Sequence, residues 1–212
     1  GGGTLENGSN VLTSSQGYYY PQEDMAYFKK EVKLISQDEG DTVPDYTLLT
    51  DTLGYNTDLE VAYFLAPTRL FSNVNKIYTE GGYYDTKKDE AYFTKRAQLA
   101  DTAYSIYGDT IYYNQATDRG YANGHIILLD KDSALTVYGN QAEFESDPET
   151  SYITDSCDAV QILEGDTLYL FSDTLRVVTD TSDQRIFHSY HHVKIFMNDL
   201  QGICDSLVYL YS

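Results

Sequence analysis

Apolar and polar residues alternate along most of this chain, which is the pattern of β-strands that bury one face. Within each segment one set of alternate positions is apolar, and these positions include Phe28, Val32, Leu34, Phe64, Leu70, Phe93, Ala97, Leu99, Ile126 and Leu128. The positions between them are mostly charged or polar, as at Lys29, Glu31, Lys33, Arg69, Arg96, Gln98 and His125. We therefore expect strands with one face toward a core and the other toward water.

A short motif recurs about every 30 residues. It reads apolar, any, small, Asp or Asn, polar, apolar, any, then apolar or Tyr, and full or partial copies begin at 12, 48, 77, 106, 137, 170 and 202. The longest interval contains SQDEGDTVPD at 36–45, whose Gly and Pro indicate an inserted loop. A second element in the first five repeats places a tyrosine at one position, namely Tyr27, Tyr63, Tyr92, Tyr121 and Tyr152. The alternation puts this tyrosine column on the outer face.

The recurring Asp marks a bend between two strands, because the apolar parity changes across it. The residue before it is small in most repeats, as at Thr50, Gly108, Gly139, Ser172 and Cys204, and suits the inside of a tight corner. Repeats of this size cannot bury their inner face alone, so they must stack. We predict an all-β fold without substantial helix, in which two facing sheets form a single domain over residues 12–212. Residues 1–11, GGGTLENGSNV, are expected to be a flexible leader.

The repeated Asp motif and the stretch FLAPTRLF at 64–71 resemble the LptA/OstA family of lipopolysaccharide transport proteins. The resemblance covers roughly residues 12–212 and implies an open β-jellyroll of stacked antiparallel strands. It also implies an apolar interior that shields acyl chains, and head-to-tail stacking through terminal strands. Its setting would be the periplasm, between the inner and the outer membrane.

Charge narrows the choice of partners. The chain has 14 Lys and Arg against 33 Asp and Glu, which gives a net charge of −19. This balance argues against nucleic acid as a partner, because phosphate contacts need clustered basic residues.

The aromatic composition agrees with a β-fold. The 22 tyrosines and the absence of tryptophan agree with strands that have half-exposed surfaces.

From the resemblance we expect a non-enzymatic lipid-binding protein without a cofactor. It would carry lipopolysaccharide or a related lipid in the periplasm, either free or associated with the outer membrane. Its partners would be other transport proteins of jellyroll type, or further copies of itself. The predicted lipid-contacting residues are the inward apolar positions Phe28, Leu34, Leu48, Leu53, Phe64, Leu70, Phe93, Leu99, Ile106, Ile111, Tyr113, Ile126, Leu128, Val137, Phe144, Leu168, Leu170, Leu175 and Val177. The alternative is a carbohydrate-binding or adhesive acidic β-solenoid, with or without calcium, that uses the tyrosine column as a sugar platform.

Other candidate groups have structural interpretations, so we expect no catalytic and no metal-binding residue. His188 and His192 would share a strand face, but no Cys or acidic residue has a usual ligand spacing beside them. The Asp-Thr and Asp-Ser pairs at 51, 101, 109, 166, 173 and 205 recur with the structural period and are interpreted as corners rather than catalytic carboxylates. The acidic loops 36–45 and 146–149 lack the spaced calcium-binding pattern. Cys157 and Cys204 could form one bridge, although two separate buried thiols are favoured.

The last copy of the motif, GICDSLVYLYS at 202–212, ends before the second strand of its repeat. An unpaired strand edge is a template for pairing with another chain. We therefore expect an open edge at Leu207 and Tyr209 that receives a partner, or further jellyroll turns beyond the C-terminus.

Overall fold

The computed structural model describes residues 2–7, 9–37, 42–72, 75–114, 116–132, 134–146, 149–179 and 185–211. Over these residues it contains seventeen strands and no helix, which confirms the predicted all-β class. The chain divides into two compact units, residues 1–102 and 103–212, called unit 1 and unit 2 below. Each unit is described by itself.

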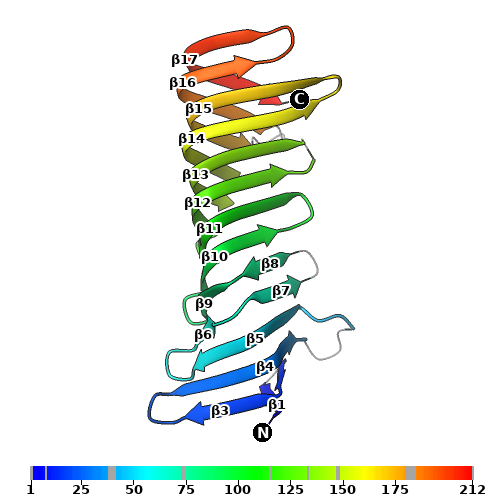
Figure 1. Cartoon of the computed structure of the whole chain (residues 1–212), viewed down its shortest axis with the longest axis vertical. Coiled ribbons are helices and arrows are strands. Elements are labelled where there is room, and N and C mark those ends of the chain that lie inside the picture. The colour runs from blue at the N-terminus through cyan, green and yellow to red at the C-terminus, as the bar shows by residue number, and fades with distance from the viewer. Residues whose placement is uncertain are drawn as a thin grey trace. The chain divides into compact units, whose positions relative to one another are not determined.

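The described residues of unit 1 form ten strands. They are β1 (Gly3–Asn7), β2 (Asn10–Ser14), β3 (Gln16–Tyr20), β4 (Met25–Ser36), β5 (Tyr46–Asn56), β6 (Val61–Phe64), β7 (Thr68–Ser72), β8 (Lys76–Thr79), β9 (Gly81–Asp85) and β10 (Glu90–Ala100). β1 pairs with β2, β4 pairs with β2, β3 and β5, and β5 pairs with β6 and β7. β6 pairs with β9, β7 with β8, and both β8 and β9 with β10 (Figure 1). All these pairings are antiparallel, as expected for stacked hairpins.

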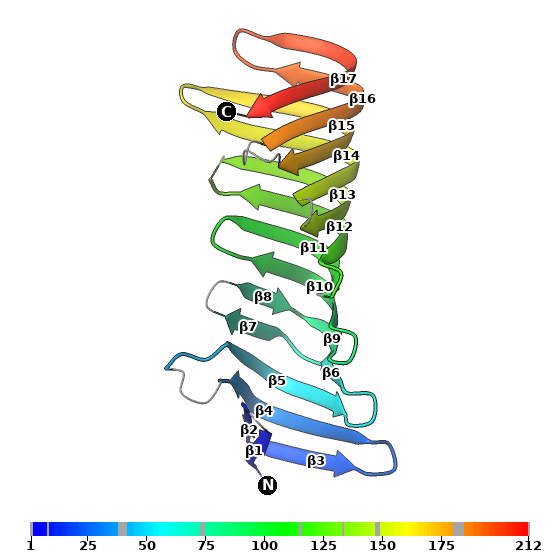
Figure 2. The same cartoon turned by 180° about the vertical axis from the view of Figure 1, so that it is seen from behind.

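In unit 2 the part of the chain that the structure describes forms seven long strands. They are β11 (Tyr104–Asn114), β12 (Arg119–Asp130), β13 (Leu135–Ser146), β14 (Glu149–Leu163), β15 (Asp166–Thr179), β16 (Arg185–Phe196) and β17 (Gln201–Tyr211). Each strand pairs with the next in an antiparallel meander (Figures 1 and 2). The repeats predicted from the sequence are therefore successive hairpins.

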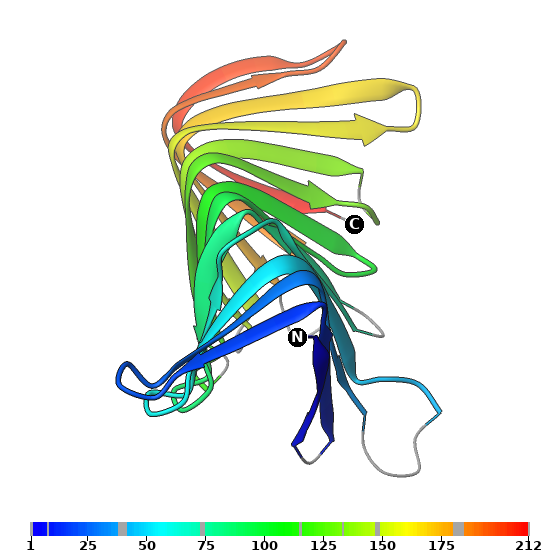
Figure 3. The same cartoon turned by 60° about the horizontal axis from the view of Figure 1, so that its bottom comes forward.

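The strands of unit 2 bend near their middle, where the register of each pairing shifts by one residue (Figure 3). Alternate strands carry two successive residues with positive φ at this point: Gly124–His125, Asp155–Ser156 and His191–His192. Such a pair inserts one extra residue and turns the strand, as β-bulges do. The neighbouring strands place Asp109, Asn140, Asp173 and Asp205 at the same bend. The prediction that the recurring Asp or Asn marks a corner is thereby confirmed for these residues.

The bend divides the strands of unit 2 into two walls. Wall A contains residues 110–114, 119–123, 141–146, 149–154, 174–179, 185–190 and 206–211, and wall B contains the other halves of the same strands. In unit 1, wall A contains β3, β6, β9 and residues 25–29, 52–56 and 90–94, whereas wall B contains β2, β7, β8 and residues 32–36, 46–50 and 97–100. The inner face of a wall is the face that carries most of its buried apolar side chains.

Unit 1 makes its bends in two ways. β4 and β10 carry positive-φ pairs at Lys30–Glu31 and Lys95–Arg96, like the long strands of unit 2. Elsewhere two short strands replace one bent strand, as in β6 and β7, which Leu65, Ala66 and Pro67 separate. Proline has no N–H to donate to a ladder, so a continuous strand cannot pass this point without losing a hydrogen bond.

The N-terminal residues differ from the prediction of a flexible leader over 1–11. Gly3–Asn7 forms β1, which pairs with β2 from Gly3 opposite Ser14 to Asn7 opposite Asn10. Alternation is weak in this glycine-rich stretch, so its strand was not apparent from the pattern. The predicted loop 36–45 follows β4, and its residues 38–41 lie outside the described residues.

Candidate functional site

The inner faces of unit 1 carry two apolar rows that run across the strands. In wall B, register places Leu12, Leu34, Leu48, Leu70, Ile77 and Leu99 side by side on successive strands. We call these six residues the leucine ladder. In wall A the corresponding row is Phe28, Leu53, Phe64, Gly82 and Phe93, and the rings of Phe64 and Phe93 stack with centroids 6.1 Å apart. Both rows present hydrocarbon to the space inside the bend.

Unit 2 repeats this arrangement. In wall B, one row consists of Ile106, Leu128, Val137, Ala159, Leu170 and Ile195. In wall A, the row nearest the bend consists of Ile111, Ala122, Ala142, Ile153, Leu175, Ser189 and Leu207. The wall A row combines small side chains at Ala122, Ala142 and Ser189 with larger ones, and close packing of the two sizes is typical of a protein core.

The nineteen predicted inner residues all lie on the inner face of their unit, but their burial differs. Ten are buried: Leu48, Leu53, Phe64, Phe93, Ile111, Ile126, Val137, Leu168, Leu170 and Leu175. Nine are half-buried: Phe28, Leu34, Leu70, Leu99, Ile106, Tyr113, Leu128, Phe144 and Val177. The buried set forms a packed core, whereas the half-buried set keeps apolar surface open to a ligand. Lipid contact by these residues stays a prediction.

Several inner residues were not identified from the sequence. Leu12 and Ile77 complete the leucine ladder, but they lie in loosely matching copies of the motif. Phe187 and Ile195 belong to the sixth repeat, whose register was ambiguous in the sequence. The structure resolves the ambiguity because the positive-φ pair at His191–His192 changes the parity within β16.

Glycine has a steric role on the inner face of wall A in unit 2, at the end of the wall far from the bend. A Cβ on Gly120 would lie 2.1 Å from Cζ of Phe144, so only glycine fits beneath this ring. Phe144 stacks with Tyr113 across the glycine, with centroids 6.2 Å apart. The pair forms a half-buried aromatic surface on the inner face.

A tyrosine closes one hairpin in each unit by donating to an aspartate five residues later. Tyr84 donates to Oδ1 of Asp89 at 3.1 Å in unit 1, and Tyr113 donates to Oδ1 of Asp118 in unit 2. Burial and the neighbouring aspartate raise the pKa of both phenols to about 12. Both hydroxyls therefore remain protonated donors at neutral pH.

The outer faces carry the predicted tyrosine column. In unit 1, register places Tyr18, Tyr27, Gly54, Tyr63, Tyr83 and Tyr92 in one row. In unit 2, Tyr112 and Tyr121 stack with centroids 4.7 Å apart, and the Arg176 guanidinium lies 5.4 Å from the centre of the Tyr152 ring. The tyrosine column is thus outside, on the faces opposite the apolar rows.

The bends carry exposed histidine–aspartate contacts. Nδ1 of His125 lies 2.8 Å from Oδ2 of Asp109, and Nδ1 of His192 lies 2.8 Å from Oδ2 of Asp173. The expectation that His188 and His192 share a strand face is wrong, because His188 belongs to wall A and His192 to the bend. Among the described residues no group of three His, Cys, Asp or Glu side chains is placed to hold a metal ion.

Two of the six predicted corner aspartates are not at bends. Asp101 lies between β10 and β11, and Asp166 begins β15. Asp166 accepts hydrogen bonds from the amides of Thr167 at 2.6 Å and Asn198 at 3.2 Å. The Asp-Thr dipeptide therefore marks chain turns of both kinds.

The two cysteines are free thiols. Cys157 is buried at the bend of β14, as predicted, whereas Cys204 is exposed, which corrects the prediction for that residue. Burial raises the pKa of Cys157 to about 11. Cys204 lies on β17, and among the described residues of unit 2 only β16 pairs with this strand, so its side chains have little cover.

β17 is the last strand of the meander and pairs with β16 within unit 2 (Figure 2). Leu207 and Tyr209 are half-buried on its inner face, opposite Ser189 and Phe187. On its outer face Ile203 is 79% exposed, and Val208 and Leu210 are also exposed. Apolar side chains on a strand with little cover are characteristic of a surface that pairs with another chain.

Bent antiparallel strands with apolar inner faces define an open β-jellyroll. Residues 1–43 and 41–109 match the family of OstA-like proteins, so the chain belongs to this family. The family supports a β-structure of the kind used in lipopolysaccharide transport. No curated protein matches the chain significantly. No helix in the described part of the chain has the length and apolar character of a membrane span.

Proposed function

We propose that this protein binds the acyl chains of lipopolysaccharide, or of a related lipid, between walls A and B in the periplasm. The observation that carries the proposal is the half-buried part of the inner apolar rows, above all Leu34, Leu70, Ile77 and Leu99. Each methylene that leaves water against such a surface contributes about 0.8 kcal/mol. The polar headgroup would stay in water, and passage along the row would require no covalent step.

The proposal includes transfer between proteins through strand edges. The sparsely covered β17 would receive an edge strand of another jellyroll protein or of a second copy, by antiparallel or parallel addition. Such head-to-tail addition need not close into a ring. Sedimentation over a hundredfold concentration range would then show oligomers that Leu207→Pro reduces, since proline removes a ladder donor. A monomer at all concentrations would contradict self-association through this edge.

Equilibrium binding of a dansyl-labelled fatty acid tests the acyl-chain site directly. Leu34→Gln places a polar amide in the leucine ladder, and we expect binding at least about tenfold weaker, which corresponds to 1.4 kcal/mol. Lys33→Gln is the matched control, because Lys33 is the adjacent exposed residue on the opposite face. Equal affinities of the two folded variants would contradict the proposed site.

The net charge of −19 predicts a dependence on salt. A phosphorylated headgroup should be repelled at low ionic strength, so binding of lipopolysaccharide should strengthen as salt or divalent cation is added. Weaker binding at higher salt would instead point to local basic residues such as Lys29, Lys33, Arg69 and Arg96, all of which are exposed on unit 1.

A further inference from the structure

A second candidate site lies on the outer face of wall A in unit 1, at the tips of the β5–β6 and β9–β10 hairpins. It is a hollow of about 400 Å³, within the range of small-molecule sites. It is lined by the apolar and aromatic side chains of Leu59, Val61, Tyr63 and Tyr83 and by the charged residues Asp85, Lys87 and Lys88. These residues face away from the leucine ladder, so the hollow is separate from the proposed acyl-chain site.

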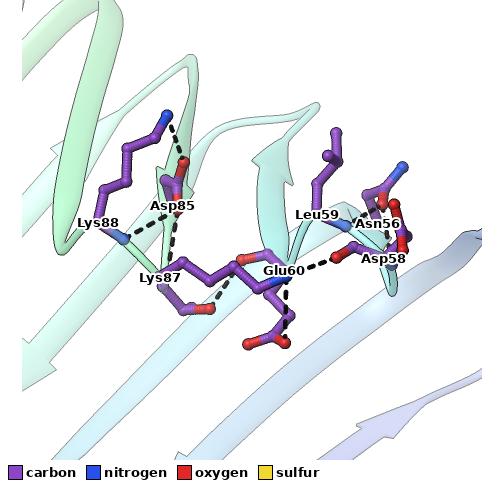
Figure 4. Close-up of polar contacts among 8 residues, drawn as sticks. Asn56, Asp58, Leu59, Glu60, Asp85, Lys87 and Lys88 are labelled. Atoms are coloured by element: carbon purple, nitrogen blue, oxygen red, sulfur yellow. Dashed lines mark hydrogen bonds and ion pairs between the residues drawn. The ribbon is translucent and has the colours of Figure 1, made fainter.

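The two hairpin tips beside the hollow are fixed by the same kind of turn. Oδ1 of Asn56 accepts hydrogen bonds from the amides of Asp58 and Leu59, and Oδ1 of Asp85 accepts from the amides of Lys87 and Lys88. The tips are also tied to each other, because Nζ of Lys87 donates to the Asp58 carbonyl at 2.7 Å (Figure 4). A rim held in this way is formed before a ligand arrives, which lowers the ordering cost of binding.

Aromatic rings continue from the hollow along the sheet. Tyr63 lies directly opposite Tyr83 on the neighbouring strand, and Tyr83 lies opposite Tyr92. The ring centroids of Tyr83 and Tyr92 are 5.8 Å apart and the planes are inclined by 42°. Half-buried tyrosines in such a strip expose ring faces to a flat apolar ligand surface and hydroxyls to its polar edge.

The charges around the hollow disfavour an anionic ligand. Lys88 pairs with Asp85 at 3.1 Å and Lys87 lies 3.5 Å from Glu60, so both ammonium groups already have a carboxylate. Burial of Asp85 acts to raise its pKa, but the hydrogen bonds from Lys88 outweigh this effect and lower the pKa. Asp85 therefore remains a carboxylate. Asp58 adds a further negative charge beside the rim. Phosphate and carboxylate ligands would therefore meet no uncompensated positive charge.

We propose that this hollow and the adjoining tyrosine strip bind a neutral saccharide. A pyranose with equatorial hydroxyls has flat C–H faces that stack on tyrosine rings, and hydroxyls at its edge that reach the carboxylate, ammonium and phenol groups of the rim. A chain of such rings would extend from the hollow over Tyr83 toward Tyr92. This activity goes beyond lipid binding and does not depend on it.

Methyl NMR of the full chain with labelled leucine and valine tests the site, with cellotetraose as the probe. Cellotetraose is neutral and consists of glucose rings with equatorial hydroxyls. We expect its addition at millimolar concentration to shift the methyl resonances of Leu59 and Val61 and to leave those of Leu34 and Leu70 on the inner face unchanged. If neither Leu59 nor Val61 shifts at any millimolar concentration of cellotetraose, the proposal is overturned.

Three variants separate stacking from other effects. Tyr83→Ala should weaken cellotetraose binding at least tenfold, whereas Tyr83→Phe, which retains the ring, should weaken it less than threefold. Tyr138→Ala removes an exposed tyrosine from wall B of unit 2, away from the hollow, and should have no effect. Equal binding by folded Tyr83→Ala and wild type would contradict the site. If Tyr83→Ala fails to fold, unchanged methyl spectra of the wild-type chain still decide against it.

Discussion

The wall B rows of the two units have the same register pattern but different exposure. In unit 1 four of the six residues of the leucine ladder are half-buried, namely Leu34, Leu70, Ile77 and Leu99. In unit 2 only Ile106 and Leu128 are half-buried, and Val137, Ala159, Leu170 and Ile195 are buried. Unit 2 therefore uses this row mainly as core, whereas unit 1 keeps apolar surface that a ligand could cover. This difference makes unit 1 the primary candidate for acyl-chain contact.

The corners of the two units differ as well. Unit 2 bends continuous strands, and at one of these bends a Cβ on Gly139 would lie 2.4 Å from Cγ2 of Ile153. Unit 1 has threonines at the equivalent inner positions, and the Thr68 hydroxyl lies 3.0 Å from that of Thr50. Thr68 begins β7 beside a break between short strands, whereas Thr50 lies within the continuous strand β5. Positive-φ pairs thus make bends in both units, and unit 1 also uses breaks between short strands.

The largest expected effect on stability comes from introducing a carboxylate on the inner face of either unit. Ile111 is 0% exposed, so Ile111→Asp should lower the free energy of unfolding by more than about 4 kcal/mol or prevent folding. Leu99→Asp, at a half-buried position of unit 1, should cost about 2 kcal/mol or less because its carboxylate can reach water. Denaturant unfolding followed by circular dichroism measures both. Similar losses in both variants would contradict the difference in packing.

Exchanging the corner residues of the units should give the next largest effect. Gly139→Thr forces a side chain against buried Ile153 and should destabilise the protein by about 2–3 kcal/mol. Thr50→Gly removes a hydroxyl contact and adds backbone freedom, for a loss of about 1 kcal/mol. Thermal and denaturant unfolding of the two variants check this order. A Gly139→Thr variant as stable as wild type would show that the corner of unit 2 is not tightly packed.

The hairpin hydrogen bonds from Tyr84 to Asp89 and from Tyr113 to Asp118, called the tyrosine locks here, should behave alike in the two units and give the smallest effect. Tyr84→Phe and Tyr113→Phe should each cost about 1 kcal/mol at neutral pH, because each removes one hydrogen bond to an aspartate. Since the folded pKa values are raised to about 12, the contribution is present below the ordinary phenol pKa of about 10 and is lost as pH rises through 12. Stability measured between pH 10 and 12 should therefore fall less steeply in either variant. An unchanged slope in one variant would show that the two locks differ.

The sequence was informative where a short pattern repeats and misleading where one copy departs from it. Alternation and the recurring Asp were enough to place Leu48 and Leu53 on the same inner face although their parity differs. Exposure could not be predicted, because it depends on how the walls cover each other rather than on alternation. The positive-φ pairs were also invisible, since they include Lys, Glu, Arg, His, Asp and Ser and have no common residue type.

The outer hollow was not predicted for a related reason. The tyrosine column indicated an aromatic outer face, and Tyr63 was part of it, but Tyr83 has a different place in its repeat. Its position opposite Tyr63 follows from the break between β8 and β9, which a pattern of continuous strands does not include. The turn contacts of Asn56 and Asp85 that shape the rim are local, yet their meeting depends on the pairing of β6 with β9.

Photocrosslinking at two adjacent residues of β7 tests the central claim most directly. Benzoylphenylalanine would replace Leu70, which is half-buried in the leucine ladder, or Arg69, which is exposed on the opposite face of the same strand. After irradiation with lipopolysaccharide, mass spectrometry of the purified protein would detect bound lipid. The account predicts an adduct at position 70 and none above background at position 69. Equal adducts at both positions, or an adduct at 69 alone, would contradict acyl-chain binding on the inner face.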